Sequence, residues 1–251
     1  FFKRKVKGDG VFEFSYTKNQ ISNTSQKLLR VLDENREKKI VSYFTNSDDE
    51  YQSIDGLSSR YPYFLNQKNA VKQLSDLVES LGFFLIVRVH PNLKNKSVRE
   101  IYRWSKISKY IQRAGFYWVS EDDPESTYDI LNRSSIVISA GSTVGVEAVY
   151  LKKQSIVITN SFYNGIIPSV SLAENLDELK NCLSKNHTNN IIESSDSYIY
   201  GAWLMAYGTE FQYFVPTHEY SVLYGLMKDG TRIASPGLFQ FSIEVFKYLF
   251  G

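Results

Sequence analysis

The sequence predicts an α/β fold, a doubly wound, Rossmann-like parallel sheet. Across residues 39–183, short apolar runs rich in β-branched residues alternate with segments of helical spacing, which is typical of repeated βαβ units. The strongest run, 83–89, is almost continuously apolar, as in a strand covered on both faces. In the stretch 136–159 two β-branched runs flank one short helix, which implies parallel strands joined by a right-handed crossover.

The individual elements follow in chain order. The expected strands are the short apolar runs 39–45, 83–89, 117–119, 136–138 and 156–158. The expected helices are the segments 25–32, 67–81, 98–114, 126–132, 144–150, 176–183 and 198–214, with a terminal helix at 239–250. We divide the chain into an N-terminal segment or remnant of an upstream domain (1–38), a Rossmann-like domain (39–185) and an aromatic-rich helical segment that packs back on it (186–251). Because the first residue is Phe rather than Met, we expect a portion of a longer polypeptide.

Composition excludes several classes of protein. The net charge of +2, from 29 basic and 27 acidic residues, gives no reason to expect nucleic acid as a partner. The single cysteine, Cys182, excludes an internal disulfide and a Cys-rich zinc site and fits a reducing compartment. No apolar run is long enough to span a bilayer and no signal peptide opens the chain, so we expect a cytoplasmic protein.

Helix 98–114 has a basic side opposite its apolar one. The basic residues on or beside it are Lys96, Arg99, Arg103, Lys106 and Arg113. This side would suit an acidic glycan or an anionic membrane, which would place the protein at the inner face of the cytoplasmic membrane. The competing interpretation is an ordinary solvated face of an amphipathic helix.

Residues just past the strands are the candidates for function, because ligands of open α/β sheets bind at the carboxyl ends of the strands. Four segments are expected to converge there: Ser47–Tyr51, His90–Pro91, Gly141–Thr143 with Glu147, and Ser161–Gly165. Gly141 allows close approach of the backbone to a ligand, Ser142 and Thr143 supply hydroxyls, and the N–H groups of the helix start face an anion. This turn is therefore a predicted phosphate seat, although a Ser-Thr pair is also an ordinary helix cap.

The other candidates each have a structural alternative. His90 can donate to a phosphate or leaving-group oxygen, and Pro91 fixes the chain direction after it, although a lone His is often structural. Glu147 is within reach of a ribose hydroxyl beside the phosphate, or it is a solvent-facing helix residue. Phe162 and Tyr163 stack on a base or sugar ring, or they belong to the core.

Four ordered motifs resemble the capsule polysaccharide biosynthesis family of glycosyltransferases. They are Ser47-Asp48-Asp49-Glu50-Tyr51, Arg88-Val89-His90-Pro91-Asn92-Leu93, Gly141-Ser142-Thr143-Val144-Gly145-Val146-Glu147-Ala148 and Ser161-Phe162-Tyr163-Asn164-Gly165. The later aromatic segments Tyr200–Trp203 and Tyr207–Thr209 are similar to that family too, so the likeness covers roughly residues 39–215. The family is similar to bacterial Kdo transferases and, more distantly, to sialyltransferases with a His-Pro motif and a Ser/Thr pair.

The resemblance implies the donor-binding half of a GT-B enzyme, with C-terminal helices, that uses a CMP-activated sugar such as CMP-Kdo without an essential metal or cofactor. His90 and the Ser142-Thr143 pair would hold the CMP phosphate. The chain departs from the family in one respect, because residues 1–38 are too short for the acceptor-side domain. That domain is expected upstream.

The acidic residues 48–50, which we call the acidic loop, are expected to carry catalysis. Displacing CMP requires a carboxylate, either as the nucleophile of a retaining double displacement or as the base that activates the acceptor hydroxyl. Asp49 is the first candidate and Glu50 the second, because they fit the family's Asp-Glu pair, and Asp48 is a spare. The alternative is a solvated turn. Three consecutive acids without a convergent His make a poor metal cage, so no metal is expected.

The predicted function is transfer of Kdo or a related acidic sugar from CMP to a polysaccharide or glycolipid acceptor in capsule or lipopolysaccharide synthesis. Two alternatives stay open. The same half-fold would also serve a nucleotide-sugar epimerase or a transferase using UDP- or CDP-linked donors. It would equally serve a non-catalytic nucleotide-binding module of a larger synthase.

Overall fold

A computed structural model gives the fold. It describes residues 2–6, 24–46, 66–123, 125–159, 161, 163–184, 192–206, 214–216, 225–227 and 232–233. The chain divides into two compact units, one of residues 1–11 with 15–205 and one of residues 12–14 with 206–251. The predicted phosphate seat and His90 belong to the first unit, so its sheet and helices decide how these residues are placed.

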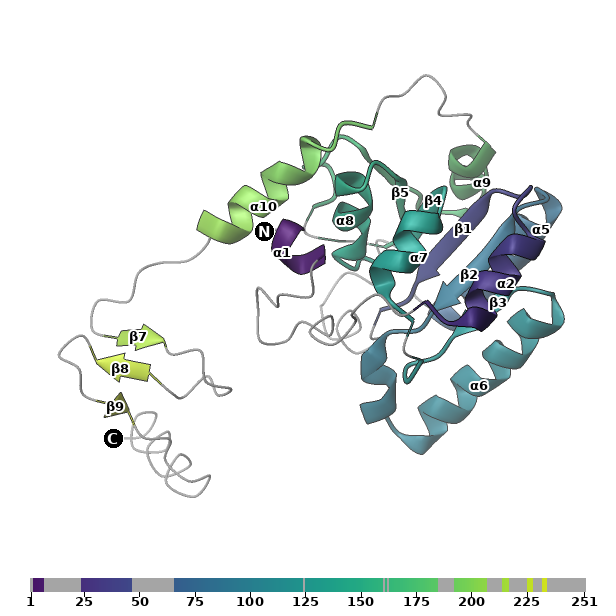
Figure 1. The fold of residues 1–251 in the computed structure, drawn as a ribbon, viewed down its shortest axis with the longest axis horizontal. Helices are drawn as coiled ribbons and strands as arrows, with labels where there is room; N and C mark the ends of the chain where they lie inside the picture. The colour runs from purple at the N-terminus through teal and green to yellow at the C-terminus, as the bar shows by residue number, and fades with distance from the viewer. Residues whose placement is uncertain are drawn as a thin grey trace. The chain divides into compact units, whose positions relative to one another are not determined.

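The first unit is built on a six-stranded sheet of order β3-β2-β1-β4-β5-β6 (Figure 1). Its strands are β1 (Ile40–Phe44), β2 (Phe84–Arg88), β3 (Tyr117–Val119), β4 (Ile136–Ser139), β5 (Gln154–Val157) and β6 (Val170–Leu172). Every neighbouring pair is parallel. This is the strand order of a Rossmann fold, in which the order reverses between β1 and β4. The predicted fold class is confirmed.

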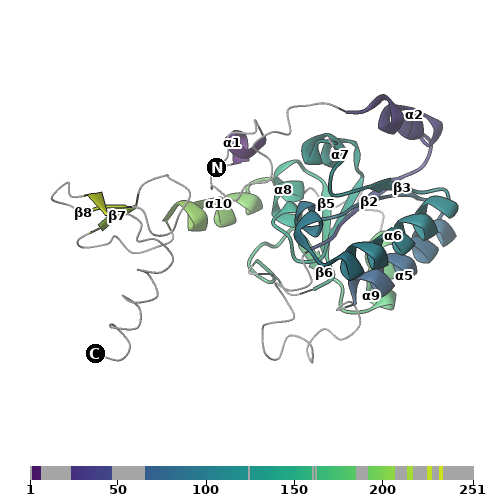
Figure 2. The ribbon, with the colours of Figure 1, turned by 90° about the horizontal axis from the view of Figure 1, so that it is seen from below.

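Helices cover both faces of the sheet. One face carries α5 (Gln67–Ser80), α6 (Val98–Arg113) and α9 (Leu176–Ser184). The opposite face carries α2 (Gln26–Glu34), α7 (Thr127–Arg133) and α8 (Val144–Tyr150). Figure 2 shows the two layers, with α5, α6 and α9 below the strands and α2 and α7 above them. The short helices α1 (Phe2–Val6) and η1 (Pro91–Asn95) and the longer α10 (Asp196–Ala206) complete the unit.

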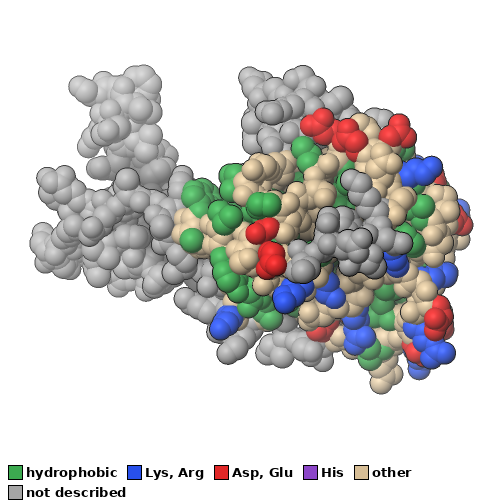
Figure 3. Space-filling view, turned by 90° about the horizontal axis from the view of Figure 1, so that it is seen from above, with side chains coloured by type: hydrophobic (Ala, Val, Ile, Leu, Met, Phe, Trp, Pro, Cys, Tyr) green, Lys and Arg blue, Asp and Glu red, His purple; other side chains and the backbone are tan. Residues whose placement is uncertain are grey.

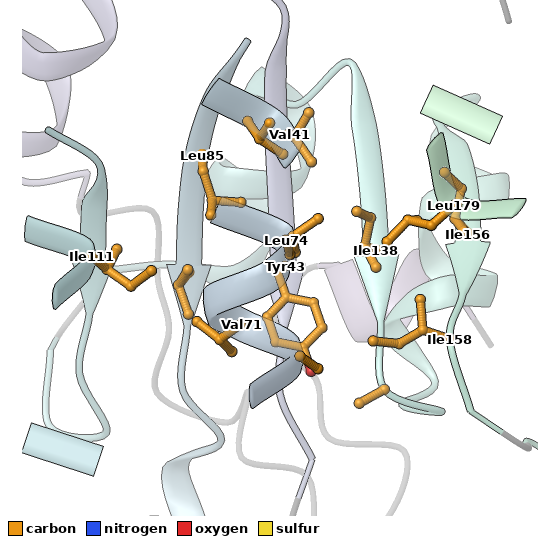
Figure 4. Packing of buried hydrophobic residues seen from close by; sticks show 14 of the residues in the cluster. Val41, Tyr43, Val71, Leu74, Leu85, Ile111, Ile138, Ile156, Ile158 and Leu179 are labelled. Carbon is orange, nitrogen blue, oxygen red and sulfur yellow. The ribbon is translucent and has the colours of Figure 1, made fainter. Parts of the chain in front are cut away.

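The core under α5, α6 and α9 is the larger apolar cluster. Strand residues alternate between the faces of the sheet, so Val41 and Tyr43 point into this layer while Ile40 and Phe44 point into the other. Figure 4 shows Val71 and Leu74 of α5 packed over the middle of the sheet, with Ile111 of α6 and Leu179 of α9 toward its two sides. Burying a side chain such as Leu74 contributes about 2 kcal/mol, so this layer is the main source of stability.

A third cluster holds α1 and α10 against α8. Its buried residues are Phe2, Val146, Val149, Val157, Tyr163, Ile167 and Tyr200. The Phe2 ring stacks on Tyr150 with centroids 4.9 Å apart. The outer side of α10 stays open, since Tyr198, Ile199 and Trp203 are exposed. Hydrophobic side chains gather at this position in Figure 3.

Most elements lie within two residues of their predicted bounds, and the differences have simple causes. β6 was not expected, because it is a half-buried edge strand of three residues. The predicted helix 198–214 is α10, which ends at Ala206. In the second unit, β7 (Phe214–Pro216), β8 (Gly225–Met227) and β9 (Arg232–Ile233) pair antiparallel where helix was expected. The expected helix 239–250 lies outside the described residues. Within the described part of the chain, no helix has the length and apolarity that crossing a membrane requires.

Candidate functional site

Side chains tie together the carboxyl ends of β1, β2 and β4. The backbone N–H of His90, just past β2, donates to Thr45 Oγ1, just past β1, at 2.8 Å. Asn46 donates from Nδ2 to the carbonyl oxygen of Ala140, just past β4, at 3.1 Å. Neighbouring strands are about 4.8 Å apart, so the ends of β2 and β4 are about 10 Å apart across β1. The structure therefore brings His90 and the Gly141–Thr143 turn to one edge, at the reversal of strand order where Rossmann folds bind ligands.

Asn46 is fixed by a reciprocal pair of hydrogen bonds with Gln67 at the start of α5. The Asn46 N–H donates to Gln67 Oε1 at 2.7 Å, and Gln67 Nε2 donates to the Asn46 carbonyl at 3.0 Å. Both side chains are buried, so these bonds are shielded from water. Sequence reasoning gave neither residue a role. The sequence signal that could have identified Asn46 is its place as a polar residue directly after the first predicted strand.

His90 has a defined tautomer. Its Nδ1 accepts from the backbone N–H of Asn92 at 3.2 Å, capping η1, whose first residue is Pro91. In the neutral imidazole the proton is then on Nε2, which becomes a donor. A half-buried donor at a strand end suits the anion contact predicted for His90. That role stays a prediction.

The turn after β4 depends on glycine at two positions. Gly141 has φ of 82°, in the left-handed region that favours glycine. A Cβ at Gly145 would lie 2.5 Å from the Tyr163 hydroxyl and 3.1 Å from Ser139 Oγ, so this position also requires glycine. The Tyr163 hydroxyl donates to the Ser142 carbonyl and holds the turn from below.

Tyr163 is fully buried in the third cluster. Its ring packs near that of Tyr200, with centroids 6.0 Å apart. The expected stacking of Tyr163 on a base or sugar is therefore not the arrangement in this structure, and the alternative of a core residue holds. The physical reason is that the chain turns back after Thr159 and places the phenol beneath the β4 turn.

Glu147 is buried and paired. Only 3% of its side chain is exposed, and it accepts from Lys5 Nζ of α1. Thr143 Oγ1 donates to Glu147 Oε1 at 3.1 Å and accepts from Lys5 Nζ at 3.2 Å. The alternative of a solvent-facing Glu147 is wrong, because α8 turns this carboxylate toward α1. Sequence reasoning gave Lys5 no role at this helix.

Two tyrosines complete what we call the Glu147 cluster: Lys5, Tyr128, Thr143, Glu147 and Tyr200. Burial, and then the nearby charge of Glu147, raises the pKa of Tyr200 to about 12. Burial, the charge of Glu147 and a hydrogen bond with Glu147, in that order, raise the pKa of Tyr128. The Tyr128 hydroxyl is therefore buried beside the Glu147 carboxylate. The cluster is thus a low-dielectric polar site beside the predicted phosphate seat.

Four predicted residues lie outside the described residues: Asp48, Asp49 and Glu50 of the acidic loop, and Phe162. Among the residues that are described, no three His, Cys, Asp or Glu side chains come together as metal ligands. Fold and site together define a Rossmann-like α/β domain with polar residues joined at the carboxyl ends of β1, β2 and β4, where its strand order reverses.

No protein-family model matches the chain, and no curated protein matches it. Solved structures with a partly similar arrangement include trehalose-6-phosphate synthase OtsA, with a TM-score of 0.48 and 11% identity over 75% of this chain and 45% of that one. The S. aureus MnaA-UDP co-structure has a TM-score of 0.46 and 12% identity over 72% of this chain and 44% of that one.

Thermosulfurimonas dismutans KpsC, a beta Kdo 2,7 transferase, has a TM-score of 0.39 and 16% identity over 68% of this chain and 50% of that one. The chain spans half or less of the length of each of these proteins. Because every one of these TM-scores is below 0.5, the fold assignment rests on the strand order of this chain and not on the likenesses.

Proposed function

We propose that this chain is the donor-binding half of a glycosyltransferase that moves Kdo or a related acidic sugar from CMP to a surface polysaccharide or glycolipid. One observation carries the proposal: the hydrogen bonds of Thr45 and Asn46 bring His90 and the Gly141–Thr143 turn to one edge of the sheet. With the ends of β2 and β4 about 10 Å apart, the His90 side chain and the N–H groups of the glycine turn can approach one phosphate from two sides.

The chemistry divides between this edge and the acidic loop that follows Asn46 in the sequence. The bond between the anomeric carbon and the CMP phosphate oxygen breaks, and CMP leaves with the electron pair. His90 Nε2–H stabilises the charge that develops on the phosphate. The acceptor hydroxyl oxygen forms the new bond to the anomeric carbon while Asp49 or Glu50 takes its proton. In the alternative double displacement, the carboxylate first bonds to the anomeric carbon and the acceptor hydroxyl then displaces it.

The remaining parts of the proposal follow from the resemblance to the capsule polysaccharide biosynthesis family. The donor phosphate is held by protein groups and not by a metal or another cofactor. The basic side of α6, where Arg99, Arg103, Lys106 and Arg113 are exposed, contacts an anionic acceptor or the inner face of the cytoplasmic membrane.

A nucleotide panel in a thermal-shift assay tests the proposal. CMP at 100 times its dissociation constant should stabilise the chain by about 2.7 kcal/mol, and His90→Gln should remove most of that stabilisation. Asn95→Ala is the matched control, because Asn95 is exposed at the end of the same short helix. Stabilisation by UDP but not by CMP would contradict a CMP-linked donor and would favour the alternative of an epimerase or a UDP-dependent transferase. No stabilisation by any nucleotide would refute nucleotide binding.

Catalysis is tested separately in the full-length protein. Asp49→Asn and Glu50→Gln should each reduce sugar transfer from CMP-Kdo strongly while leaving CMP binding nearly unchanged. Unchanged transfer by both variants would leave a binding module without a catalytic acidic loop.

A further inference from the structure

The outward side of α6 has a continuous stripe of exposed residues. A helix has about 3.6 residues per turn, so residues three or four positions apart lie one above the other on its surface. The side of α6 that faces the core follows this spacing with Trp104, Ile107 and Ile111. The exposed residues that follow it on the outward side, which we call the α6 stripe, are Val98, Tyr102, Lys106, Lys109 and Arg113.

The charge of the α6 stripe is positive and is not balanced by the helix itself. Arg99 and Arg103 lie beside the stripe and are exposed too. The single acidic residue of α6, Glu100, turns toward α5, where its carboxylate is 2.5 Å from Lys68 Nζ. It is also 3.9 Å from Arg103. Among the described residues, no ion pair includes a residue of the stripe, so its positive charges face solvent.

The N-terminal end of the stripe is apolar and aromatic. Val98 is 85% exposed and Tyr102 is 59% exposed. Lys106 Nζ lies 4.6 Å from the centre of the Tyr102 ring, so a cation and an aromatic ring share one place on the surface. Tyrosine is enriched at membrane–water interfaces, because its ring is apolar and its hydroxyl stays in water. Clusters of about four to eight Lys and Arg on an amphipathic helix are typical of surfaces that bind anionic lipid.

The position of α6 leaves the stripe accessible and close to the candidate site. α6 packs beside β3, the edge strand of the sheet, and Figure 1 shows it on the side of the first unit away from α10. Only η1 lies between His90 and the cap of α6 at Ser97. α6 therefore begins at the edge of the sheet where β2 ends, and Val98 and Tyr102 are at the end of the helix nearest His90.

We propose that the α6 stripe docks on a bilayer that contains anionic phospholipid. Lys106, Lys109 and Arg113 contact lipid phosphates, and Val98 and Tyr102 enter the headgroup region. Charge complementarity selects an anionic surface, and the apolar end selects lipid, because a soluble acidic glycan would leave Val98 in water. The inference deepens the proposed function and rests on it in one respect: docking holds the edge with His90 close to an acceptor anchored in the same bilayer.

Co-sedimentation of the chain with lipid vesicles tests docking. The wild type should bind vesicles of phosphatidylglycerol with phosphatidylcholine, should not bind phosphatidylcholine alone, and should dissociate as salt is added, because salt screens surface charges. A variant without the three cations should bind the anionic vesicles about a hundredfold more weakly. Its substitutions are Lys106→Gln, Lys109→Gln and Arg113→Gln. Wild type that does not bind anionic vesicles, or binds both kinds equally, would overturn the inference.

A matched variant on the opposite face of the sheet controls for net charge. It removes two lysines and one arginine that are exposed on or beside α2, and it should change binding less than about threefold. Its substitutions are Lys27→Gln, Arg30→Gln and Lys38→Gln. Equal losses in the two variants would show that only net charge matters and would overturn the inference. Thermal unfolding checks that each variant folds, which is expected because every substituted side chain is exposed.

The apolar end of the stripe has its own test. Val98→Ser with Tyr102→Ser should weaken binding to anionic vesicles about tenfold, because less apolar surface leaves water on docking. Tyr198→Ser with Ile199→Ser on α10 is the matched control, since these residues are 54% and 47% exposed, and binding should stay within about twofold. Loss in the α10 variant with none in the α6 variant would place the membrane on α10 and overturn the inference.

Two further results separate this inference from its rivals. Binding to alginate, a soluble acidic polysaccharide, without binding to anionic vesicles would overturn membrane docking in favour of a glycan. Vesicle binding is measured without nucleotide, so it is independent of the proposed function. Vesicle binding through α6 without stabilisation by any nucleotide would keep docking and refute the proposed function. Stabilisation by CMP without vesicle binding would keep the function and refute docking.

Discussion

The two faces of the sheet differ in how they are held to their helices. Under α5, α6 and α9 the contact is the larger apolar cluster, whereas the side of α2, α7 and α8 has a smaller apolar cluster together with buried charges. The charged side chains that are buried among the described residues are Arg88, Glu125 and Glu147, and all belong to this second side. Apolar packing is not directional, while a buried charge is stable only in one arrangement of donors and acceptors. The first face therefore supplies stability, and the second fixes positions.

The contacts of Glu125 illustrate the second side. Its carboxylate accepts from the backbone N–H of Ser25 at 3.1 Å, from the Ser25 hydroxyl and from the Tyr117 hydroxyl at 3.3 Å. Arg88 donates to the Glu125 carbonyl oxygen at 2.6 Å. Burial lowers the pKa of Arg88 to about 10, opposed by the nearby charges of Asp123 and Glu125. These bonds fix where α2 begins and where β2 ends, two residues before His90.

The largest effect on stability should come from the apolar face. Leu74→Ala, at a residue that is 1% exposed, should lower the free energy of unfolding by about 3 kcal/mol, because it removes buried methyl groups and leaves a cavity. Leu29→Ala on α2, at a residue that is 39% exposed, should cost less than about 1 kcal/mol. Urea denaturation measures both. Similar losses in the two variants would contradict the assignment of stability to this face.

On the polar side, Glu125→Gln should lower the free energy of unfolding by about 2 kcal/mol, because charge-assisted bonds weaken while Arg88 stays buried. The exposed Asp122→Asn is the control and should change stability by less than about 0.5 kcal/mol. When Glu125→Gln is combined with Arg88→Met, the loss in free energy of unfolding should be smaller than the sum of the two single losses. Strict additivity in this double-mutant cycle would show that the two residues are not coupled.

The smallest effect should appear in alkaline solution. Burial is the main cause that raises the pKa of Tyr117 and Tyr200 to about 12, so the folded protein favours their neutral forms. Their contribution to stability is complete below pH 10 and is lost between about pH 10 and 12, as the unfolded chain ionises first. A spectroscopic titration of the 18 tyrosines should show a small late step near pH 12.

Two variants sharpen this titration. Tyr200→Phe should reduce the late step, and Glu147→Gln should move the remaining Tyr200 ionisation to lower pH, because it removes the second cause of the shift. In denaturant the late step should merge with the main one. A late step that Tyr200→Phe leaves unchanged would contradict the placement of this phenol beside Glu147.

Periodicity predicted much of this architecture from the sequence. The βαβ unit at 136–159 and the helices beginning at Gln67 and Val98 were expected, because their apolar residues recur with the period of the element that they form. β6 was missed because a short, half-buried strand has no such pattern. The strands β7 to β9 begin where the predicted helix 198–214 was expected to end, and their two to three residues are too few to show a period in the sequence.

The sequence by itself determined the parallel sheet and the carboxyl ends at which His90 and Gly141–Thr143 stand. These features depend on local spacing and backbone conformation, which neighbouring residues specify. Only the tertiary structure decided that Lys5 pairs with Glu147, that Asn46 joins β1 to β4, and that Tyr163 lies in the core. Such contacts join residues far apart in the chain, and which distant donor meets which acceptor depends on how helices and strands pack.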